Sequence, residues 1–479
     1  MKLAFDFVCD EAPLFAGVAE RFVRDGAQVT GLTMGRRWQG SWNGRFDTQA
    51  LSGLFAPVPG LEEELRRIED EYGASNPGSF LLADRFLCQR PPQQQRLALV
   101  NTFHVVEEFF RQEKPDVYFS TGVAYLYNLV CLAVCSRTGI PHVSMFSTRQ
   151  SAPRLTVSLG RGDRWDLVDR EYDELQDQEV ENTPEYREAK EYLAEFQEEA
   201  DQPFYMAAAR QSFGLRLVFV RELLTRLRYW YGEGWGGQEN DYITQLPFWY
   251  VRRDLLKIAR AQYVIHCRER IFDRPAAGEA FYLFPLHLQP EASTLVHAEW
   301  YVDQLNTIRN VARCLPADTF LYVKEHKSAL GRHGLRFYRE LRTIHNVRLI
   351  AHDADTPALI RHSRGVIILS STVGWEAVLL NRPVYLLGKV FYQGLEGVVP
   401  VSNFGELRER LAQKEGVGLS EKGRDRLVRF LMAIRRQSFE GVFDVAKMDM
   451  RARVLAADNV ERVYKGLRDA LPRIINSRG

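Results

Sequence analysis

The sequence predicts an α/β protein in which two doubly wound, Rossmann-like domains face a cleft, with a helical insertion between them and helices at the C-terminal end. Three observations lead to this prediction. The chain has 479 residues, which is too long for a single domain built around one hydrophobic core. Apolar strand patterns alternate with helical patterns in residues 1–164 and again in residues 273–403. Between these two regions, in residues 165–272, the strand signal disappears.

The first domain is predicted from four strand-like runs with helical stretches between them. The run "KLAFDFV" alternates apolar and polar residues, and "APLFAGVAERFVRDG" then places apolar residues at helical spacing until Gly26. "AQVTGLTMG" and "PDVYFSTG" read as further strands, followed by a helix over 123–137 and a strand in "GIPHVSMFS". Apolar strands separated by helices are typical of a parallel sheet that is covered on both faces.

The middle region contains two helical stretches of opposite charge. Residues 171–200 are strongly acidic, whereas residues 215–235 are basic and aromatic. The basic stretch is predicted to pack inside the protein and to meet the acidic one, although it could also rest on a membrane surface. "DRPAAGE" at 273–279 marks a linker, because Pro275 and Gly278 interrupt regular structure.

The second domain repeats the α/β pattern with five predicted parallel strands. These strands lie in "AFYLF", "TFLYVKEH", "VRLIAH", "GVIILSS" and "PVYLLG", and the helices between them are predicted over 300–314, 334–344, 356–362 and 373–381. Residues 404–479 follow as C-terminal helices. Two such domains in tandem predict a deep cleft into which the carboxyl ends of both sheets point.

Composition excludes several classes of function. The 63 Lys and Arg residues balance the 62 Asp and Glu residues, which argues against a nucleic-acid binder. The six cysteines form no CxxC pair or ligand cluster, so we expect no metal and a reducing compartment; they are Cys9, Cys88, Cys131, Cys135, Cys267 and Cys314. Asp6 interrupts the N-terminal apolar run, and residues 123–135 are too short to span a bilayer. A cytoplasmic protein, soluble or peripheral to the inner face of the membrane, is therefore expected.

Polar clusters follow three strands of the second domain, at the edge where open α/β sheets bind ligands. "PLHLQPE" supplies His287, Gln289 and Glu291. "FLYVKEHK" ends an apolar strand in Lys324, Glu325, His326 and Lys327, and "LSSTVGWEA" places Ser370, Ser371 and Thr372 at a helix start. The sequence thus predicts one site built from three loops.

Each of these clusters also has a structural explanation. Ser371 or Thr372 could serve only as the helix N-cap, yet the same hydroxyls and backbone amides make a phosphate site. Glu376 could accept bonds from a ribose or merely favour the helix N-terminus. The remaining histidines show no metal-ligand spacing and are taken as surface residues, including His333, His345, His352 and His362.

The period of two along a strand predicts which charged residues act together. Lys324 and His326 fall on the same side of the strand and could touch one phosphate, with His326 as a cation or a neutral donor. Glu325 should point the other way, and Lys327 reads as a solvated rim. The pair Lys324 and His326 is therefore predicted to face Ser371 across the neighbouring strands.

These motifs resemble the bacterial capsule and surface polysaccharide biosynthesis glycosyltransferases. The likeness lies in "YLFPLHLQPEASTL", "YVDQLNTIRNVARCLPADTFLYVKEH" and "VIILSSTVGWEAVLLNRPVYLLGKVFY", and covers roughly residues 280–400, with a weaker likeness in "PDVYFSTG" and "GIPHVSMFSTR". The family includes the Kdo transferases of capsule export systems and, more distantly, bacterial sialyltransferases and glycerophosphotransferases of teichoic acid synthesis.

The resemblance implies a GT-B fold and a metal-independent glycosyltransferase without a cofactor. The C-terminal domain would bind the nucleotide-sugar donor, and His326 with Ser370, Ser371 and Thr372 would hold its phosphate. The proline of the family's His-Pro motif is replaced here by Lys327. Several relatives use CMP-linked acidic sugars such as Kdo, so Lys324 would be suited to a donor carboxylate; His287, Gln289 and Glu376 complete the expected donor site.

The implied reaction also requires a base and an acceptor site. Asp10 and Glu11 in the loop after the first strand are the first candidates for the base, and Glu291 is the second; an acidic pair there could also be only a helix cap. Arg149 and Arg154, beside the loop after "HVSMFS", could bind an anionic acceptor or satisfy neighbouring acids. The expected acceptor is a surface polysaccharide or a lipid-linked glycan, with contact to the inner membrane or to a capsule assembly complex.

Three alternatives remain at this point. The same fold could carry a CDP-alcohol phosphotransferase or a nucleotide-sugar epimerase. It could also belong to a non-catalytic polysaccharide-binding or assembly protein, which would bind a donor without turnover. A nucleic-acid binder is disfavoured by the balanced charge.

Overall fold

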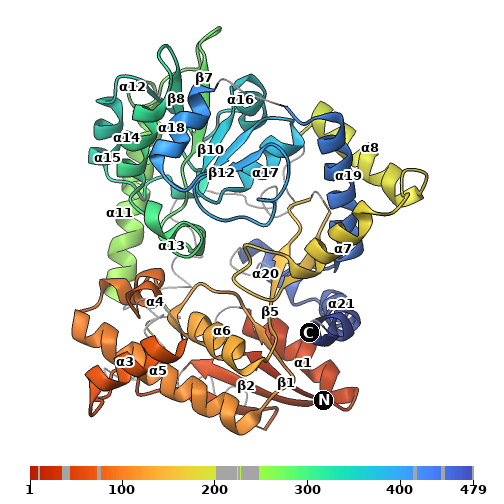
Figure 1. Ribbon diagram of the computed structural model, residues 1–479. Helices are drawn as coiled ribbons and strands as arrows, with labels where there is room; N and C mark the ends of the chain where they lie inside the picture. The colour runs from red at the N-terminus through yellow and green to blue at the C-terminus, as the bar shows by residue number, and fades with distance from the viewer. Residues whose placement is uncertain are drawn as a thin grey trace.

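The computed structural model describes residues 1–8, 11–34, 44–72, 77–150, 152–200, 224, 227, 247–413, 418–443 and 448–476. It contains two β-sheets, each flanked by helices, which lie one above the other in Figure 1. Strands β1–β6 belong to one sheet and strands β7–β12 to the other. The predicted α/β class with two parallel-sheet domains is confirmed.

The first sheet has seven strands in the order β13-β6-β5-β4-β1-β2-β3. Its strands are β1 (Lys2–Asp6), β2 (Gln28–Met34), β3 (Asp47–Leu51), β4 (Val117–Ser120), β5 (His142–Ser147), β6 (Arg154–Ser158) and β13 (Phe439–Glu440). The strands β1 to β5 are parallel, and β6 and β13 are added in antiparallel pairings. In β1, Leu3, Ala4, Phe5 and Asp6 are all completely buried, so both faces of this strand are covered.

Helices cover both faces of this sheet. The helices are α1 (Ala12–Arg24), α3 (Leu61–Tyr72), α4 (Pro77–Ala83), α5 (Pro92–Glu113) and α6 (Leu126–Thr138), with the 3-10 turn η1 (Leu87–Gln89). Helix α6 ends on Gly139, whose left-handed conformation (φ 69°) is readily adopted by glycine. On one face α1 packs against the C-terminal helix α21 (Ala457–Ile475), and on the other α5 packs against α3 and α6.

The middle of the chain contributes α7 (Asp166–Gln176), α8 (Pro184–Glu198), α11 (Pro247–His266) and α12 (Arg268–Ile271). The acidic stretch forms α7 and α8, and both pack against α19 (Glu421–Arg436). Arginines of α19 meet the acidic side chains, as in the Arg436–Glu171 pair at 3.0 Å. The basic stretch 215–235, which was expected to be the partner of the acidic helices, lies outside the described residues apart from 224 and 227.

The second sheet has six parallel strands in the order β12-β11-β10-β7-β8-β9. They are β7 (Phe281–Pro285), β8 (Phe320–Lys324), β9 (Val347–Ile350), β10 (Val366–Ile368), β11 (Val384–Leu386) and β12 (Val398–Pro400). The five predicted strands are therefore present, and β12 is an additional one. Strand β7 lies in the middle between β8 and β10, so the loops after these three strands are neighbours.

Short helices connect the strands of the second sheet. They are α13 (Ala292–Leu295), η3 (Glu299–Tyr301), α14 (Gln304–Cys314), η4 (Lys327–Ala329), α15 (Leu335–Arg342), α16 (Thr356–His362), α17 (Thr372–Leu379) and α18 (Phe404–Ala412). Several begin with a side-chain cap: Asp303 for α14, Asp355 for α16 and, as one of the two residues named from the sequence, Ser371 for α17. The local sequence therefore sets where these helices start.

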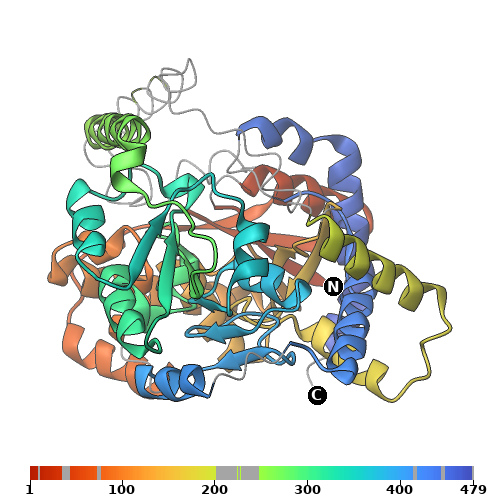
Figure 2. The same ribbon diagram turned by 90° about the horizontal axis from the view of Figure 1, so that it is seen from above.

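The C-terminal segment returns to the first domain. Helix α19 runs along the second domain, and β13, α20 (Met448–Val454) and α21 then join the first one, so both chain ends in Figure 1 lie beside the first sheet. Figure 2 shows the blue C-terminal helices next to the red α1. Val463 and Leu467 of α21 are completely buried in the same core as Phe5 and Phe15.

Apolar contacts join the two domains at two places. Val296, just after α13, belongs to the core that contains Leu126 and Tyr127 of the first domain, and α13 packs against α4. The ring of Trp165, before α7, stacks on Phe391 with ring centroids 3.6 Å apart. None of the described helices is long and apolar enough to cross a membrane.

Candidate functional site

The imidazole of His326 is half-buried directly after β8. Its Nδ1 accepts a hydrogen bond from the backbone N–H of Ser328 at 3.1 Å, so His326 caps η4. Burial lowers the pKa of His326 to about 4, and the charges of Lys324 and Arg332 act in the same direction. The ring is therefore neutral at neutral pH, and its proton lies on Nε2 because Nδ1 is an acceptor. Of the two charge states considered from sequence, burial favours the neutral one.

His287 joins the loop after β7 to the loop after β10. It is 5% exposed, and its Nε2 accepts the backbone N–H of Ser370 at 3.2 Å. Its own backbone N–H donates to Oε1 of Gln304 at 2.7 Å. Burial lowers the pKa of His287 to about 3, with a further contribution from His326, which shows that the two imidazoles lie near each other. The structure thus brings the three predicted loops together.

The hydroxyl loop begins α17. Ser371 is the N-cap, and its Oγ accepts the N–H of Val373 at 3.1 Å. The Ser370 hydroxyl donates to the carbonyl of Ser293, while Tyr392 Oη donates to the Ser371 carbonyl at 2.9 Å. Ser371 still has a hydroxyl proton to donate, so its capping role and a phosphate-binding role are compatible. Thr372 follows as the first residue of the helix.

Lys324 is almost completely buried, at 9% exposure, beneath these loops. Its ammonium donates to the carbonyl of His352 at 2.9 Å. Burial lowers the pKa of Lys324, whereas the carboxylates of Glu325, Glu376 and Asp353 act to raise it. Burial likewise raises the pKa of Glu376 to about 7, and Lys324 opposes that shift. Lys324, at the end of β8, and Glu376, in α17, therefore lie within electrostatic reach of each other.

Glu325 points to the opposite side of the strand, as predicted. Its carboxylate accepts the Tyr338 hydroxyl at 2.6 Å and the backbone N–H of His326 at 2.6 Å. Burial raises the pKa of Glu325 to about 7, although both hydrogen bonds favour the ionised form. Lys327 is exposed on η4, in line with its expected place at the rim.

The candidates for the general base are not all described. Asp10 lies outside the described residues, and Glu11 directly precedes α1 without a side-chain capping bond to that helix. Glu291 precedes α13, and its Oε2 accepts the Ser293 hydroxyl at 3.0 Å. Gln289 donates to the carbonyl of Val302 at 2.6 Å, which fastens the loop after β7.

The two arginines predicted for the acceptor lie in different surroundings. Arg149, after β5, has φ 63° and lies close enough to Tyr392 for its charge to act on the pKa of that hydroxyl. It therefore extends from the first domain toward the start of α17. Arg154 lies apart from this group, because its guanidinium donates to Ser438 Oγ at 2.9 Å and to the Ser438 carbonyl at 2.6 Å. Those bonds attach the segment before β13 to β6.

Sequence reasoning missed several buried polar groups. Asp6 is completely buried at the end of β1, where it accepts hydrogen bonds from Thr121 Oγ1 at 2.6 Å and Asn128 Nδ2 at 3.0 Å. Burial raises its pKa to about 6. A charged residue inside an apolar strand was the available signal. Two histidines expected at the surface are partly buried: His333 stacks on Phe337, and His352 supplies the carbonyl that holds Lys324.

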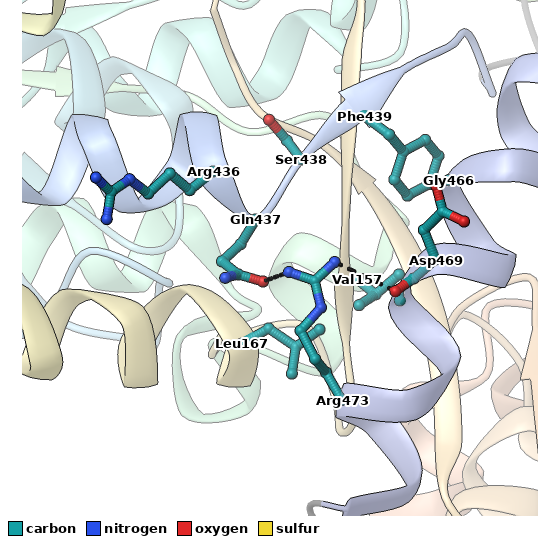
Figure 3. Close-up of a pocket in the computed structure, with 10 residues that line it drawn as sticks. Val157, Leu167, Arg436, Gln437, Ser438, Phe439, Gly466, Asp469 and Arg473 are labelled. Carbon is teal, nitrogen blue, oxygen red and sulfur yellow. Dashed lines mark hydrogen bonds between the residues drawn. The ribbon is translucent and has the colours of Figure 1, made fainter. Parts of the chain in front are cut away.

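A separate cavity of about 170 Å³ lies where β13 meets β6 (Figure 3). Its polar lining is paired internally, since Arg473 donates to Gln437 Oε1 at 2.5 Å and Gln437 donates to Glu171 at 2.6 Å. It contains none of the residues of the three loops. Among the described residues, no group of three or more His, Cys, Asp or Glu side chains is arranged to hold a metal ion.

Comparison with known proteins agrees with the resemblance seen in the sequence. Residues 248–410 match the family model described as "Capsule polysaccharide biosynthesis protein". The capsule polysaccharide modification protein LipB of Neisseria meningitidis is 26% identical over 147 residues, which are 29% of this chain and 35% of LipB. The capsule polysaccharide export protein KpsS of Escherichia coli is 24% identical over 153 residues, covering 30% and 37% of the two chains. The matched part thus spans about a third of each relative.

One solved structure that matches over most of the chain is the β-Kdo 2,7 transferase of Thermosulfurimonas dismutans KpsC. It is 12% identical, with a TM-score of 0.33, over 80% of this chain and 97% of the transferase structure. The assignment therefore depends on the sequence matches, and the range matched by the family model includes all three loops. Residues 248–410, which include His287, His326 and Ser371, are therefore similar to the capsule polysaccharide biosynthesis proteins.

Proposed function

We propose that this protein is a glycosyltransferase of capsule or surface polysaccharide synthesis, which binds a nucleotide-sugar donor at the loops after β7, β8 and β10. The observation that carries the proposal is the neutral His326, whose Nε2–H has no hydrogen-bond acceptor among the described residues, near the capped start of α17. A leaving phosphate needs hydrogen-bond donors and positive potential, and these two features supply both.

Each residue has a defined role in this proposal. His326 Nε2–H and the Ser371 hydroxyl donate to the donor phosphate, together with the free amides of the first turn of α17. Lys324 stabilises the phosphate through its positive charge rather than by direct contact, because its ammonium donates to the carbonyl of His352. His287 keeps the Ser370 and His326 loops in register. Glu376 lies one turn along α17, where it could accept a ribose hydroxyl.

The acceptor hydroxyl must lose a proton as it attacks the anomeric carbon. Glu291, Glu11 and Asp10 remain the candidates for this base, and Arg149 is the candidate for acceptor binding from the first domain. In its more specific form, the proposal is that the enzyme transfers an acidic sugar such as Kdo from a CMP donor. The transfer needs no metal ion, and the acceptor is a polysaccharide or a lipid-linked glycan. We place the reaction on the cytoplasmic side of the inner membrane, where such donors are made.

A thermal-shift panel with CMP, CDP, UDP, GDP and their sugars tests the donor site. We expect one base family to raise the melting temperature, and His326→Ala and Ser371→Ala to reduce that affinity by roughly tenfold each, the loss of a charged hydrogen bond. His345→Ala is the matched control, since His345 is an exposed histidine of the same domain. A wild-type protein that responds to no nucleotide contradicts the proposal.

Turnover separates the alternatives. Incubation with the stabilising nucleotide sugar should release the nucleotide only when a glycan acceptor is present. An epimerase would change the sugar without an acceptor, and a CDP-alcohol phosphotransferase would release CMP from a CDP-alcohol. Donor binding without any turnover would identify a non-catalytic assembly protein.

A further inference from the structure

A cavity of about 620 Å³ lies in the first domain and contains no residue of the three donor loops. It is bounded by the C-terminal ends of α3, α5 and α6, which pack against one another on one face of the first sheet (Figure 1). The residues just before β4 and β5 complete it, so it lies at the edge of the sheet opposite to the carboxyl ends of these strands. Its volume is within the roughly 300–1,000 Å³ that is typical of sites for small ligands.

The floor of this cavity is apolar. Phe110 of α5 and Val134 of α6 are each 2% exposed, and Pro115 and Ile140 extend the floor toward the two strands. The ring of Phe110 packs edge-on against Tyr118 of β4, with ring centroids 5.3 Å apart, so its position is fixed from behind. Such a floor suits a ligand that has one apolar face to bury.

The rim of the cavity carries polar groups that hold one another in place. Arg67 donates to both carboxylate oxygens of Glu107, at 2.9 Å and 3.1 Å, and Tyr72 Oη donates to the same carboxylate at 2.6 Å. Arg67 also donates to Glu71 at 3.1 Å, and the Arg137 guanidinium lies 5.5 Å from the centroid of the Tyr72 ring. A carboxylate has about four acceptor positions and a guanidinium has five N–H donors, so this rim retains both kinds of hydrogen-bonding capacity.

Lys114 adds a donor to this rim. It ends α5 in the left-handed conformation, with φ 43°. Its exposed side chain lines the cavity, and among the described residues its ammonium has neither a hydrogen-bond acceptor nor an ion-pair partner. A ligand in the cavity therefore meets one unpaired ammonium beside groups that are already oriented.

This combination favours a carbohydrate over other classes of ligand. A sugar ring presents C–H groups to an apolar floor, and its hydroxyls both donate and accept, as a rim of guanidinium and carboxylate groups requires. A compact anion would face the carboxylates of Glu71 and Glu107. A wholly apolar molecule would remove water from the rim without replacing its hydrogen bonds.

We propose that this cavity is a second carbohydrate site, which binds pyranose rings of a glycan apart from the donor loops. The inference rests on the proposed function, which makes a surface glycan the polymer that the protein encounters. A chain that is held here and whose end reaches the donor loops is bound at two points, which raises its effective concentration at those loops. The site therefore favours long acceptors over short ones.

Isothermal titration of the full chain tests the site with three oligosaccharides: maltohexaose, chitohexaose and a hyaluronan hexasaccharide. Citrate, a compact anion, is the fourth probe. We expect at least one oligosaccharide to bind roughly tenfold or more tightly than citrate. Binding of none of the three, or equal binding of citrate, would overturn the inference.

Two variants test where the oligosaccharide binds. Thr138 is exposed at the end of α6 and lines the cavity, so the indole of Thr138→Trp should obstruct it and weaken binding by roughly tenfold or more. Ser136→Trp is the matched control, because Ser136 is exposed at the same helix end and lies outside the lining; its affinity should stay within about twofold of wild type. Lys114→Asn removes the ammonium and keeps a residue that tolerates the left-handed backbone, so binding should weaken by roughly threefold to tenfold. Equal affinity in Thr138→Trp and Ser136→Trp would show that the sugar binds elsewhere.

Two further measurements separate this site from the donor site and from an effect on folding. His326→Ala should bind the oligosaccharide as the wild-type protein does; loss of binding there would place the sugar at the donor loops and overturn the inference. Thr138→Trp should respond to nucleotides like the wild type, so a failure of nucleotide binding reports on the proposed function alone. Thr138→Trp should also melt at the temperature of Ser136→Trp. If it melts lower, Lys114→Asn decides in its place, because that change breaks no side-chain hydrogen bond of the described structure, and unchanged oligosaccharide affinity in Lys114→Asn would then overturn the inference.

Discussion

The two histidines of the site are uncharged at neutral pH for the same physical reason. Removal from water disfavours the imidazolium, and nearby cations add to the effect, so the pKa values fall to about 4 for His326 and about 3 for His287. Each ring then has one acceptor nitrogen and one donor nitrogen, and backbone N–H groups take the acceptors. Because the acceptor nitrogen of His326 is occupied, its other ring nitrogen carries the proton. That N–H can donate to a phosphate without a prior protonation step.

Glu325 allows a test of how burial acts on a single carboxyl group. Its pKa is raised from 4.5 to about 7, so the folded chain binds more protons than the unfolded chain within that window. The free energy of unfolding therefore falls as the pH rises from 4.5 to 7. Glu325→Gln cannot titrate, so its stability relative to wild type should grow with pH, by at most roughly 3 kcal/mol.

Denaturant unfolding at several values between about pH 5 and about pH 8 measures this difference, and all unchanged groups cancel between the two proteins. Glu340→Gln is the control, because Arg336 and Arg309 lower the pKa of that partly exposed carboxyl. A Glu325→Gln curve that runs parallel to wild type would contradict the account.

At the scale of single residues, the sequence predicted the direction of a side chain along its own strand but not its contacts with residues of other strands. The period of two correctly predicted that Glu325 leaves the side shared by its neighbours, since that rule is local. It could not show that the ammonium of Lys324 is held by the carbonyl of His352, because that residue follows another strand.

At the scale of elements, helix starts were predictable and sheet edges were not. Ser371 caps α17 as expected, because an N-cap depends on two or three adjacent residues. Strand β13 was missed: it has two residues, and it pairs with β6 from far along the chain, with Phe439 opposite Leu155. A short edge strand carries almost no periodic signal.

Arg429 of α19 offers a test of how the helical insertion is held. Its side chain is 7% exposed and pairs with Asp425 at 2.7 Å. It also donates to the carbonyl of Leu175, near the end of α7, and to the carbonyl of Gln178 at 2.8 Å. Arg429→Ala leaves these acceptors without a donor in a buried place, so we expect a loss of roughly 3 kcal/mol.

Thermal unfolding measures that loss, and Arg424→Ala, on an exposed position of the same helix, is the control. Hydrogen exchange should show the loss of protection concentrated in α7 and α8, which pack on α19. A melting temperature equal to that of the control would mean that the arginine contributes nothing net.

At the scale of the whole molecule, the chain crosses between the domains twice. It leaves the first domain through α7 and returns after α19 through β13 and α21. Two α/β domains were predictable because each repeats a local strand and helix rhythm, and the C-terminal helices were predicted as helices. Their attachment to the first domain was not, since it depends on which distant apolar face they cover.

Because α21 packs on the first domain, a substitution in α21 can test whether the stability of the protein and its affinity for the donor change independently. Leu467 of α21 is fully buried in the core of the first domain with Phe22 and Val463, far along the chain from the His326 loops. Leu467→Ala removes buried methyl groups and leaves a cavity, so the free energy of unfolding should fall by roughly 2–5 kcal/mol. Nucleotide affinity should stay within twofold of wild type, because the donor loops belong to the second sheet.

Calorimetric melting and nucleotide titration of the same sample measure both quantities. His326→Ala should lower nucleotide affinity strongly and cost only the stability of the η4 cap, which is less than the cost of Leu467→Ala. The two variants therefore differ in which quantity changes more, if the second domain alone binds the donor. Leu455→Ala, a partly buried leucine against the same core, is a milder matched control for Leu467→Ala. The contrary result is that Leu467→Ala lowers nucleotide affinity in proportion to stability. That result would mean that the first domain controls the donor site through the loops that it contacts. Donor binding could then no longer be assigned to the second domain alone.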